Sequence, residues 1–411
     1  MSSSTDSLEA IDFDKFHRSE LPELLASGNG RLAAAALHRG SLAFRVDGGA
    51  YTYSRSEDSI EIAPGDETAE VVIELSQENW SRMVRETMTA PGLLYGGKVK
   101  CLRGNAIKFV GWEPVLRAMY NGRPVWNPED ILLDRAGDPL DASKGFQIDD
   151  DREEMAHFLR TAGFLVVRNV FDASEVEGFL EEAAVLQTEA VKGDQLSWWG
   201  KNAAGEEILC RVNRAGAKPR LASIPHDPRM LKLVELADET LVPRIRGNQE
   251  EEVSLIFKRP VMTEGLSDLP WHRDCGMGGH AEVCPVLIAS LFLTQSCPES
   301  GDLRMLPGSW SGSVPYVDAN DPRAPRGIGI AAAPGDVSLH YGDTMHAAPT
   351  PEANDRASYR ISAVTGYSKP GSHMPEAKGG YNSVMHQSED GQIEHLSKVT
   401  DRLSTKKESD R

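Results

Sequence analysis

Hydrophobic and polar positions alternate in short runs through the first third of the chain. The runs 42–46, 51–54, 59–62 and 71–75 are separated by Asp47-Gly48-Gly49 and Pro64-Gly65, which are turn signals. A period of two predicts β-strands. The Ala-rich run 32–37 and the segment 78–86, with Ser76 as its N-cap, predict helices. Short strands at 99–102 and 107–110 and a helix with Val115, Leu116 and Met119 complete this part. We therefore expect a smaller α+β domain over residues 15–130, with an antiparallel sheet and helices on one side.

The rest of the chain has a different order of elements. The segment 121–151 is rich in Pro, Gly and Asp and predicts a linker, which we place at residues 131–150. Apolar periodicity then predicts a helix at 153–161, a strand at 163–167 and a helix at 175–191, capped by Asp172 or Ser174. Strand-like runs recur at 253–257, 286–294, 335–340 and 360–367. Helices followed by spaced strands predict a jelly roll or barrel faced by helices over residues 151–370. The overall class is α+β, and residues 371–411 are expected to be an irregular tail.

Composition narrows the class of protein. The formal net charge of −18 argues against nucleic acid as a partner, because phosphate binding needs a basic surface. The sequence has no apolar run of 18 residues, so we expect no membrane span, and its first residues lack the features of a signal peptide. Five cysteines without a Cys-x-x-Cys pair are typical of a reduced, cytoplasmic protein. The oligomeric state is left open.

The strongest chemical signal is Trp271-His272-Arg273-Asp274, followed much later by His346. Two imidazoles and one carboxylate on one face of a metal ion leave the opposite face open, as in non-haem Fe(II) oxygenases. A His-x-Asp pair also occurs by chance, and a strand histidine is often only a core or surface residue. His340 is the nearest competing ligand, but its six-residue step from His346 predicts a different level of the sheet. We predict that His272, Asp274 and His346 bind the metal.

Ordered motifs around these residues resemble a known family. They are Gly163-Phe164-Leu165-Val166-Val167, Ile256-Phe257-Lys258-Arg259-Pro260, Ser300-Gly301-Asp302-Leu303, Leu306-Pro307-Gly308-Ser309 and Gly342-Asp343-Thr344-Met345-His346. Together with the His-x-Asp pair they resemble the phytanoyl-CoA dioxygenase family of Fe(II)/2-oxoglutarate oxygenases, over about residues 153–367. The resemblance implies a double-stranded β-helix and the cofactors Fe(II), 2-oxoglutarate and O2.

The resemblance also implies a cation for the far carboxylate of 2-oxoglutarate. Arg360 begins a predicted strand, and Ser362 shares its face, so the two are our candidates for binding this cosubstrate. Arg356 is the alternative, but its acidic neighbours predict a solvated surface arginine. In related halogenases a small residue replaces the carboxylate ligand. Because Asp274 is present, the resemblance implies hydroxylation or a related oxidation.

The substrate is less well defined by the sequence. Trp271, Trp198 and Trp199 are candidate substrate-binding residues, although the pair at 198–199 equally fits burial under a loop. Arg273 could contact substrate or point to solvent. Ser290 stands where several relatives carry Trp. We expect an apolar, lipid-like substrate, such as an acyl thioester, a sterol or a terpenoid.

The N-terminal domain resembles the sterol carrier protein 2-like fold. The shared pattern comprises residues 43–46, 60–62 and 71–75, then Trp80, residues 97–100 and Trp112-Glu113-Pro114. This resemblance implies an apolar tunnel for a lipid. The alternative is a domain that only braces or dimerises the catalytic part. A competing hypothesis for the whole chain is a lipid-binding or transfer protein with an inactive oxygenase domain.

Overall fold

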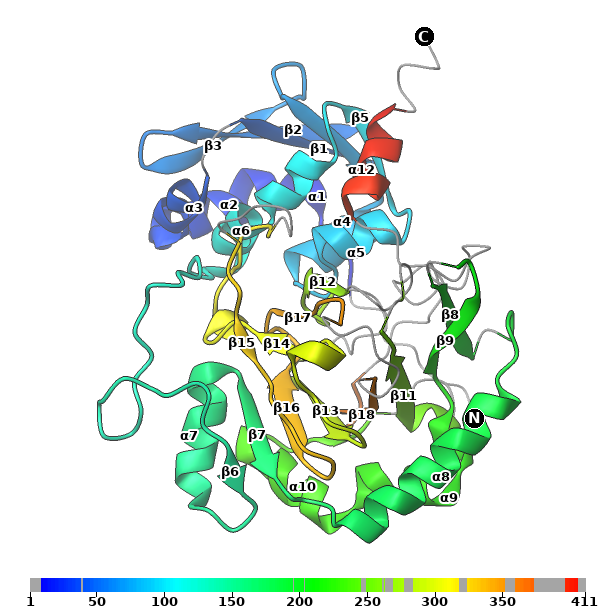
Figure 1. Ribbon diagram of the computed structural model, residues 1–411. Coiled ribbons are helices and arrows are strands. Elements are labelled where there is room, and N and C mark those ends of the chain that lie inside the picture. Colours follow the sequence, from blue (N-terminus) through cyan, green and yellow to red (C-terminus); the bar gives the residue numbers. More distant parts are fainter. Residues whose placement is uncertain are drawn as a thin grey trace.

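The computed structural model describes the chain as two parts, each built around its own hydrophobic core. The described residues are 9–37, 40–194, 196–202, 204–244, 249–260, 262, 269–276, 284–317, 324–351, 359–372 and 396–405. We call residues 9–122 the N-terminal domain and residues 146–372 the second domain. In Figure 1 the N-terminal domain lies above the second domain, with α4, α5 and α6 on the side of its sheet that faces the second domain.

The N-terminal domain is a five-stranded sheet with helices against one face. Its elements are α1 (Phe13–Lys15), a π-helical turn (Phe16–Glu20), α2 (Leu21–Leu24), a second π-helical turn (Leu25–Asn29), α3 (Gly30–Ala36), β1 (Ser41–Val46), β2 (Gly49–Ser56), β3 (Ser59–Pro64), β4 (Val71–Leu75), α4 (Gln77–Val84), α5 (Ala90–Tyr95), β5 (Val99–Arg103) and α6 (Ile107–Asn121). The strand order is β3-β2-β1-β4-β5. The strands predicted between residues 42 and 75 are confirmed.

Two predictions for this domain are wrong. The sheet is not wholly antiparallel, because the chain crosses from β3 to the free edge of β1, where β4 pairs in parallel. Residues 107–110 are not a strand but the first turn of α6. Phe109, Trp112 and Leu116 recur at helical spacing and are buried, so the longer apolar period overrides the short β-like run. The helix ends at Gly122, whose φ of 65° is the left-handed conformation that glycine adopts readily.

The C-terminal segment is also not wholly irregular. Residues Leu396–Thr405 form helix α12, which packs against α5, α6 and β5 of the N-terminal domain. Its Leu396 and Val399 are buried in the N-terminal core. The Ser404 hydroxyl accepts a hydrogen bond from the backbone N–H of Ala106 (3.1 Å), just before α6. The chain therefore returns to its first domain, a tertiary contact that local polarity does not reveal.

The second domain contains two sheets. Its helices and strands are β6 (Phe146–Gln147), α7 (Arg152–Ala162), β7 (Phe164–Arg168), α8 (Ala173–Glu189), β8 (Ser197–Lys201), β9 (Glu207–Val212), α9 (Pro219–Ser223), α10 (Pro228–Val234), β10 (Val242–Pro243), β11 (Val253–Lys258), β12 (Leu269–His272), β13 (Val286–Phe292), β14 (Arg304–Met305), β15 (Ile328–Gly329), β16 (Val337–Tyr341), β17 (His346–Ala348) and β18 (Arg360–Ser368). The larger sheet has the order β6-β7-β16-β13-β18-β11-β9-β8, with β10 beside β18, and the smaller has the order β12-β17-β14-β15.

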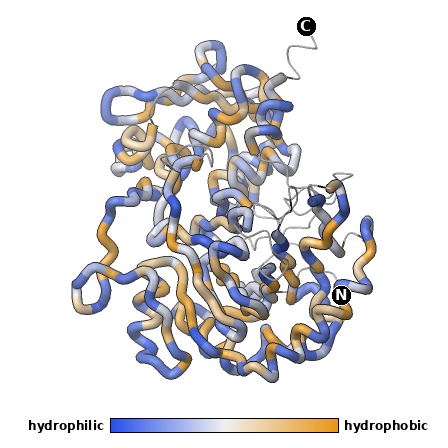
Figure 2. Tube along the Cα trace, in the orientation of Figure 1, coloured by the Kyte–Doolittle hydropathy of each residue, from blue (hydrophilic) through white to orange (hydrophobic). Residues whose placement is uncertain are grey.

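The predicted helices and strands of this domain are confirmed, with small shifts at their ends. Asp172 rather than Ser174 caps α8, in a reciprocal pair of hydrogen bonds with Glu175. The segment predicted as a linker contributes β6, which pairs in parallel with β7. Figure 2 shows apolar positions following the central strands. Within the described ranges, no helix combines the length and the apolar character needed to cross a bilayer.

A buried histidine makes the stability of the N-terminal domain depend on pH. His17 Nδ1 donates to the Phe13 carbonyl, so Nε2 of the neutral ring accepts from the Tyr53 hydroxyl. Burial lowers the pKa of His17 from 6.5 to about 4. The unfolded chain therefore binds the proton more readily, and stability present above pH 6.5 is lost as the pH falls towards 4.

We expect acidification from pH 6.5 to 4 to remove up to roughly 3 kcal/mol of stability through His17. Thermal unfolding measured across this range should show a steeper loss in the wild type than in a His17→Gln variant. Equal slopes for the two proteins would contradict this role.

Candidate metal centre

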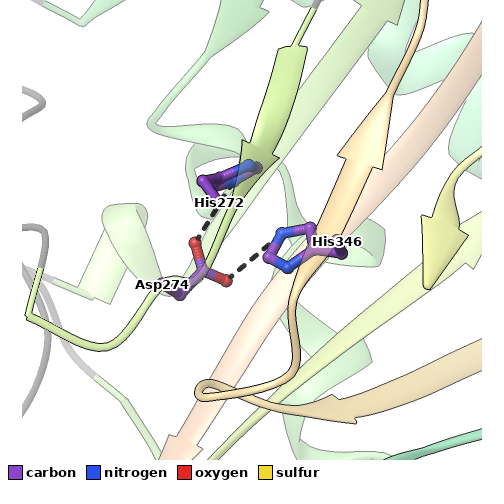
Figure 3. A group of neighbouring side chains, drawn as sticks. All are labelled: His272, Asp274 and His346. Atoms are coloured by element: carbon purple, nitrogen blue, oxygen red, sulfur yellow. Dashed lines mark ion pairs between the residues drawn. The ribbon is translucent and has the colours of Figure 1, made fainter. Parts of the chain in front are cut away.

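The predicted ligands meet where β12 pairs with β17. His272 is the direct cross-strand partner of His346. Asp274 lies two residues beyond His272, just after β12 ends, and its carboxylate turns towards both imidazoles (Figure 3). Each of the three residues offers one ligand atom, and these atoms lie within 4.8 Å of one another. Antiparallel pairing thus brings together ligands that are far apart in sequence.

The distances between the donor atoms are slightly longer than those around a bound metal ion. Asp274 Oδ1 lies 4.0 Å from His272 Nε2, and Asp274 Oδ2 lies 3.9 Å from His346 Nε2. Nitrogen and oxygen ligands lie about 2 Å from an ion, so neighbouring ligands at a right angle lie about 3 Å apart. Movement of each side chain by less than about 1 Å would bring the three donor atoms onto one ion.

Backbone carbonyls orient both imidazoles. His272 Nδ1 donates to the Pro270 carbonyl at 2.8 Å, and His346 Nδ1 donates to the Thr344 carbonyl at 2.9 Å. With the proton held on Nδ1, the lone pair of each Nε2 is available towards Asp274. This is the usual way in which a second hydrogen bond fixes the tautomer of a metal-binding histidine.

Burial and mutual charge set the protonation of these groups. Burial lowers the pKa of both His272 and His346 to about 4, so both are neutral near pH 7. Burial alone would raise the pKa of Asp274, but the neighbouring imidazoles of His340, His346 and His272 lower it well below its usual range. Neutral imidazole and ionised carboxylate are the forms that bind a metal ion, so the donor set fits one.

His340 lies closer to this group than the sequence predicted. It is on β16, and its Nε2 is 3.6 Å from Asp274 Oδ2. Its ring centroid is 4.6 Å from that of His346. Neither ring nitrogen has a hydrogen-bond partner in the described part of the chain. The expectation of a different level is therefore wrong, because β16 belongs to the opposing sheet and faces the β12–β17 pair across the cavity.

The predicted cosubstrate residues line the same cavity. Arg360 begins β18 and Ser362 follows on the same face, and both side chains are buried beside the candidate ligands. Burial lowers the pKa of Arg360 to about 10, partly offset by Asp302, and the side chain stays charged at pH 7. Its Nε has no hydrogen-bond partner among the described residues. Arg356, the alternative, lies outside the described residues.

The three candidate substrate tryptophans have different surroundings. Trp198 is buried in β8 and lines the cavity, with the Arg211 guanidinium 4.5 Å from its ring centroid. Trp199 packs against the main core of the second domain. A Cβ on Gly327 would lie 2.5 Å from the Trp271 ring, so this ring packs against Gly327. Ser290 also lines the cavity.

Sequence reasoning missed several charged residues in this cavity. Arg244 directly follows β10 and is 5% exposed, whereas Lys258, in β11, is 1% exposed. Both line the cavity, as do Glu251 and Glu252. Lys258 lies one residue beyond the strand predicted at 253–257, and its position opposite Arg360 follows from the register of β11 and β18, which the sequence did not predict. No local pattern identifies Arg244.

Comparison with known proteins agrees with this arrangement. Residues 159–357 match the family model of phytanoyl-CoA dioxygenase (PhyH). This segment contains the complete candidate triad. The protein is a 2-oxoglutarate-dependent oxygenase. Its cofactors are Fe(II), 2-oxoglutarate and O2, and two imidazoles with one carboxylate are the donor set that suits such an iron.

Solved structures give more distant similarities. The non-haem α-ketoglutarate-dependent carbocyclase SnoK from nogalamycin biosynthesis is 22% identical, with a TM-score of 0.44, covering 62% of this chain and 98% of that one. AviO1 from Streptomyces viridochromogenes Tue57 is 22% identical, with a TM-score of 0.43, covering 55% and 98%. EctD from S. alaskensis, solved with 2-oxoglutarate and 5-hydroxyectoine, is 19% identical, with a TM-score of 0.44, covering 62% and 90%. No curated protein matches the sequence.

The triad makes a direct prediction about metal binding. Wild-type protein titrated anaerobically with Co(II) should bind one equivalent and develop visible ligand-field absorption. His346→Ala and Asp274→Ala should each lose this binding, because two ligands hold the ion poorly. His157→Ala, on α7 and bonded to the Leu133 carbonyl, is the matched control and should bind normally. Normal Co(II) affinity in either triad variant would show that the ion binds elsewhere.

Proposed function

We propose that this protein hydroxylates a small organic substrate, with Fe(II) held by His272, Asp274 and His346 and 2-oxoglutarate held by Arg360 and Ser362. The proposal rests on one observation: a single cavity is lined both by the candidate metal ligands and by the candidate cosubstrate residues. The candidate ligands form one wall, and a buried guanidinium stands on another. An inactive oxygenase domain in a lipid-transfer protein, the competing hypothesis, has no need to keep this complete set.

The reaction assigned to the site balances as follows: substrate C–H, O2 and 2-oxoglutarate give substrate C–OH, succinate and CO2. When bound, Fe(II) supplies the open positions at which O2 and 2-oxoglutarate are brought together. The chain's own residues bind and orient. Arg360 pairs with the far carboxylate of 2-oxoglutarate through its planar fork, and the Ser362 hydroxyl donates a second bond. Asp274 occupies the position that a halide would need, which favours hydroxylation.

We further infer that the two sheets form a double-stranded β-helix. Strands β11, β13, β16 and β18 lie in the larger sheet, whereas β12, β14, β15 and β17 lie in the smaller one. Successive strands from β11 onward are thus divided between two antiparallel sheets that face each other across the cavity. This division supports a jelly roll, in which the candidate ligands project into the cavity from the smaller sheet.

The cavity lining refines the class of substrate. The apolar, lipid-like substrate expected from the sequence is supported by Trp198, Ile256 and Ile288. The same cavity is also lined by Arg211 and the buried Arg244, together with Glu251 and Glu252, so its wall offers charged as well as apolar groups to a ligand. We infer an amphipathic acid, whose carbon skeleton lies on the apolar wall and whose carboxylate pairs with these guanidinium groups.

The role of the N-terminal domain as a lipid carrier stays a prediction. Trp80, Tyr53, Phe44 and Phe109 are fully buried between its sheet and helices, where the sterol carrier resemblance implies a tunnel. Their side chains fill this space by edge contacts, such as Phe44 on Phe109 at 5.8 Å. This packing supports the alternative, in which the domain braces the catalytic part.

Replacing Arg360 tests the function directly. Arg360→Ala should raise the KM for 2-oxoglutarate by roughly 30-fold or more, because a buried charge-assisted pair is worth about 2–5 kcal/mol. Arg360→Lys, which keeps the charge but loses the fork, should give an intermediate value. Arg356→Ala is the control, and a larger effect there than at Arg360 would overturn the assignment.

Matched ligands test the substrate class. Dodecanoic acid should stimulate succinate formation at concentrations at least about 10-fold lower than methyl dodecanoate, because only the acid makes charge-assisted bonds to the arginines. In Arg244→Met the two ligands should become equivalent. A wild-type protein that favours the ester would instead support a wholly apolar substrate.

A further inference from the structure

Arg273 lies between two candidate ligands but points away from the cavity. Side chains alternate along an extended segment, so His272 and Asp274 face inward and Arg273 faces outward. The sequence suggested contact with substrate or with solvent, and both expectations are wrong. Arg273 instead forms ion pairs with Glu113 of α6 and with Asp343, whose Oδ1 lies 2.9 Å from Nη1. Its side chain is only 12% exposed.

Asp343 connects the same cluster to the third ligand. It precedes His346 by three residues and carries a second ion pair, 3.2 Å from Oδ2 to Nη2 of Arg117 in α6. Arg117 also holds Glu86 through two bonds of 3.0 Å. Both chain segments that supply ligands are therefore bound, through one buried cluster, to the N-terminal domain.

The cluster is balanced in charge and almost closed to solvent. Arg117, Arg123 and Arg273 face Glu86, Glu113 and Asp343, and the side chains other than Arg123 are 7–16% exposed. Removing one partner from such a cluster leaves a buried charge uncompensated. Glu86 has a φ of 59°, a backbone conformation that is unfavourable for residues other than glycine. Its two hydrogen bonds to Arg117 help to stabilise this conformation.

A second contact fixes the chain directly after Asp274. The Thr89 backbone N–H donates to the Gly276 carbonyl at 3.0 Å, immediately before α5. A Cβ on Gly92 would lie 2.1 Å from that carbonyl oxygen, so only glycine allows this approach. On the other side, the Cys275 N–H donates to the Gly342 carbonyl at 2.9 Å. The loop that carries Asp274 is thus clamped between the two domains.

We propose that the N-terminal domain positions the metal ligands, with Glu113 and Arg273 as the positioning residues. This inference rests on the proposed function, because it assumes that His272, Asp274 and His346 bind the ion. Glu113 holds Arg273 from outside, and Arg273 fixes the rotation of the segment on which His272 and Asp274 stand. The donor atoms of the candidate ligands are about 1 Å farther apart than they would be around a bound ion. A small rotation of this segment would therefore change how well the three donors converge on one ion.

The test measures Co(II) affinity in the full-length protein. Glu113→Gln keeps the shape of the side chain but removes its charge, and it should weaken Co(II) binding by about 10- to 100-fold, as is usual for partners that orient metal ligands. Arg273→Lys keeps a charge but cannot pair with Glu113 and Asp343 at once, so it should weaken binding less. The absorption spectrum of bound Co(II) should change in both variants.

Asp66→Asn is the matched control. The Asp66 side chain is 9% exposed, against 16% for Glu113, and it pairs at 2.5 Å with Arg45 of β1, within the N-terminal domain. This variant should lower the thermal unfolding midpoint but leave Co(II) affinity unchanged. If Glu113→Gln lowers stability as Asp66→Asn does and keeps wild-type affinity and spectrum, the cluster is only structural and the inference is overturned.

Three further outcomes are distinguishable. If Glu113→Gln does not fold, Arg273→Lys is judged by the same criterion against Asp66→Asn. If the wild-type protein binds no Co(II), the triad assignment itself fails. If the wild type and the control bind one equivalent while both cluster variants bind as tightly, only the positioning role fails.

Discussion

The pairing of β12 with β17 is the contact on which the candidate site depends. His272 stands opposite His346, and each ring is fixed by a hydrogen bond from Nδ1 to a carbonyl two residues earlier in its own chain segment. A shift of one residue would turn either imidazole to the other face of the sheet. Because β12 and β17 are short, their own ladder contributes few bonds, and the register must also be held from outside.

That external support comes from the contact between domains. Ion pairs buried between two surfaces are weak evidence for added stability, because the cost of removing charges from water offsets much of their attraction. They do, however, specify geometry, since a misplaced partner leaves a charge unpaired. The cluster around Arg273 and Asp343 specifies geometry in this way. It favours one orientation of α6 relative to the segments before and after the ligands.

The sequence was sufficient to single out the three candidate ligands that the structure brings together, and to predict most elements of the second domain, because strong motifs and strand periods are local signals. It did not reveal the parallel pairing of β1 with β4 or the return of α12 to the N-terminal core, since both depend on contacts between distant segments. His340 and Arg273 were misjudged for a related reason. Spacing along the chain places a side chain on a strand, but only the packing of one sheet or domain on another decides what faces it.

The chemistry of the cavity follows from the placement of its cations. Lys258 and Arg360 are cross-strand neighbours in β11 and β18, and both are almost fully buried. Like charges at directly opposed positions are unfavourable. Lys258 Nζ donates to the Ala348 carbonyl, which turns its ammonium towards β17 and leaves the space before Arg360 to an incoming ligand. This separation of the two cations is compatible with the proposed pairing of Arg360 with a carboxylate. The bond from Lys258 to Ala348 also joins β11, which pairs with β18, to β17, which carries the candidate ligand His346, so the candidate metal ligands and these cations belong to one connected framework.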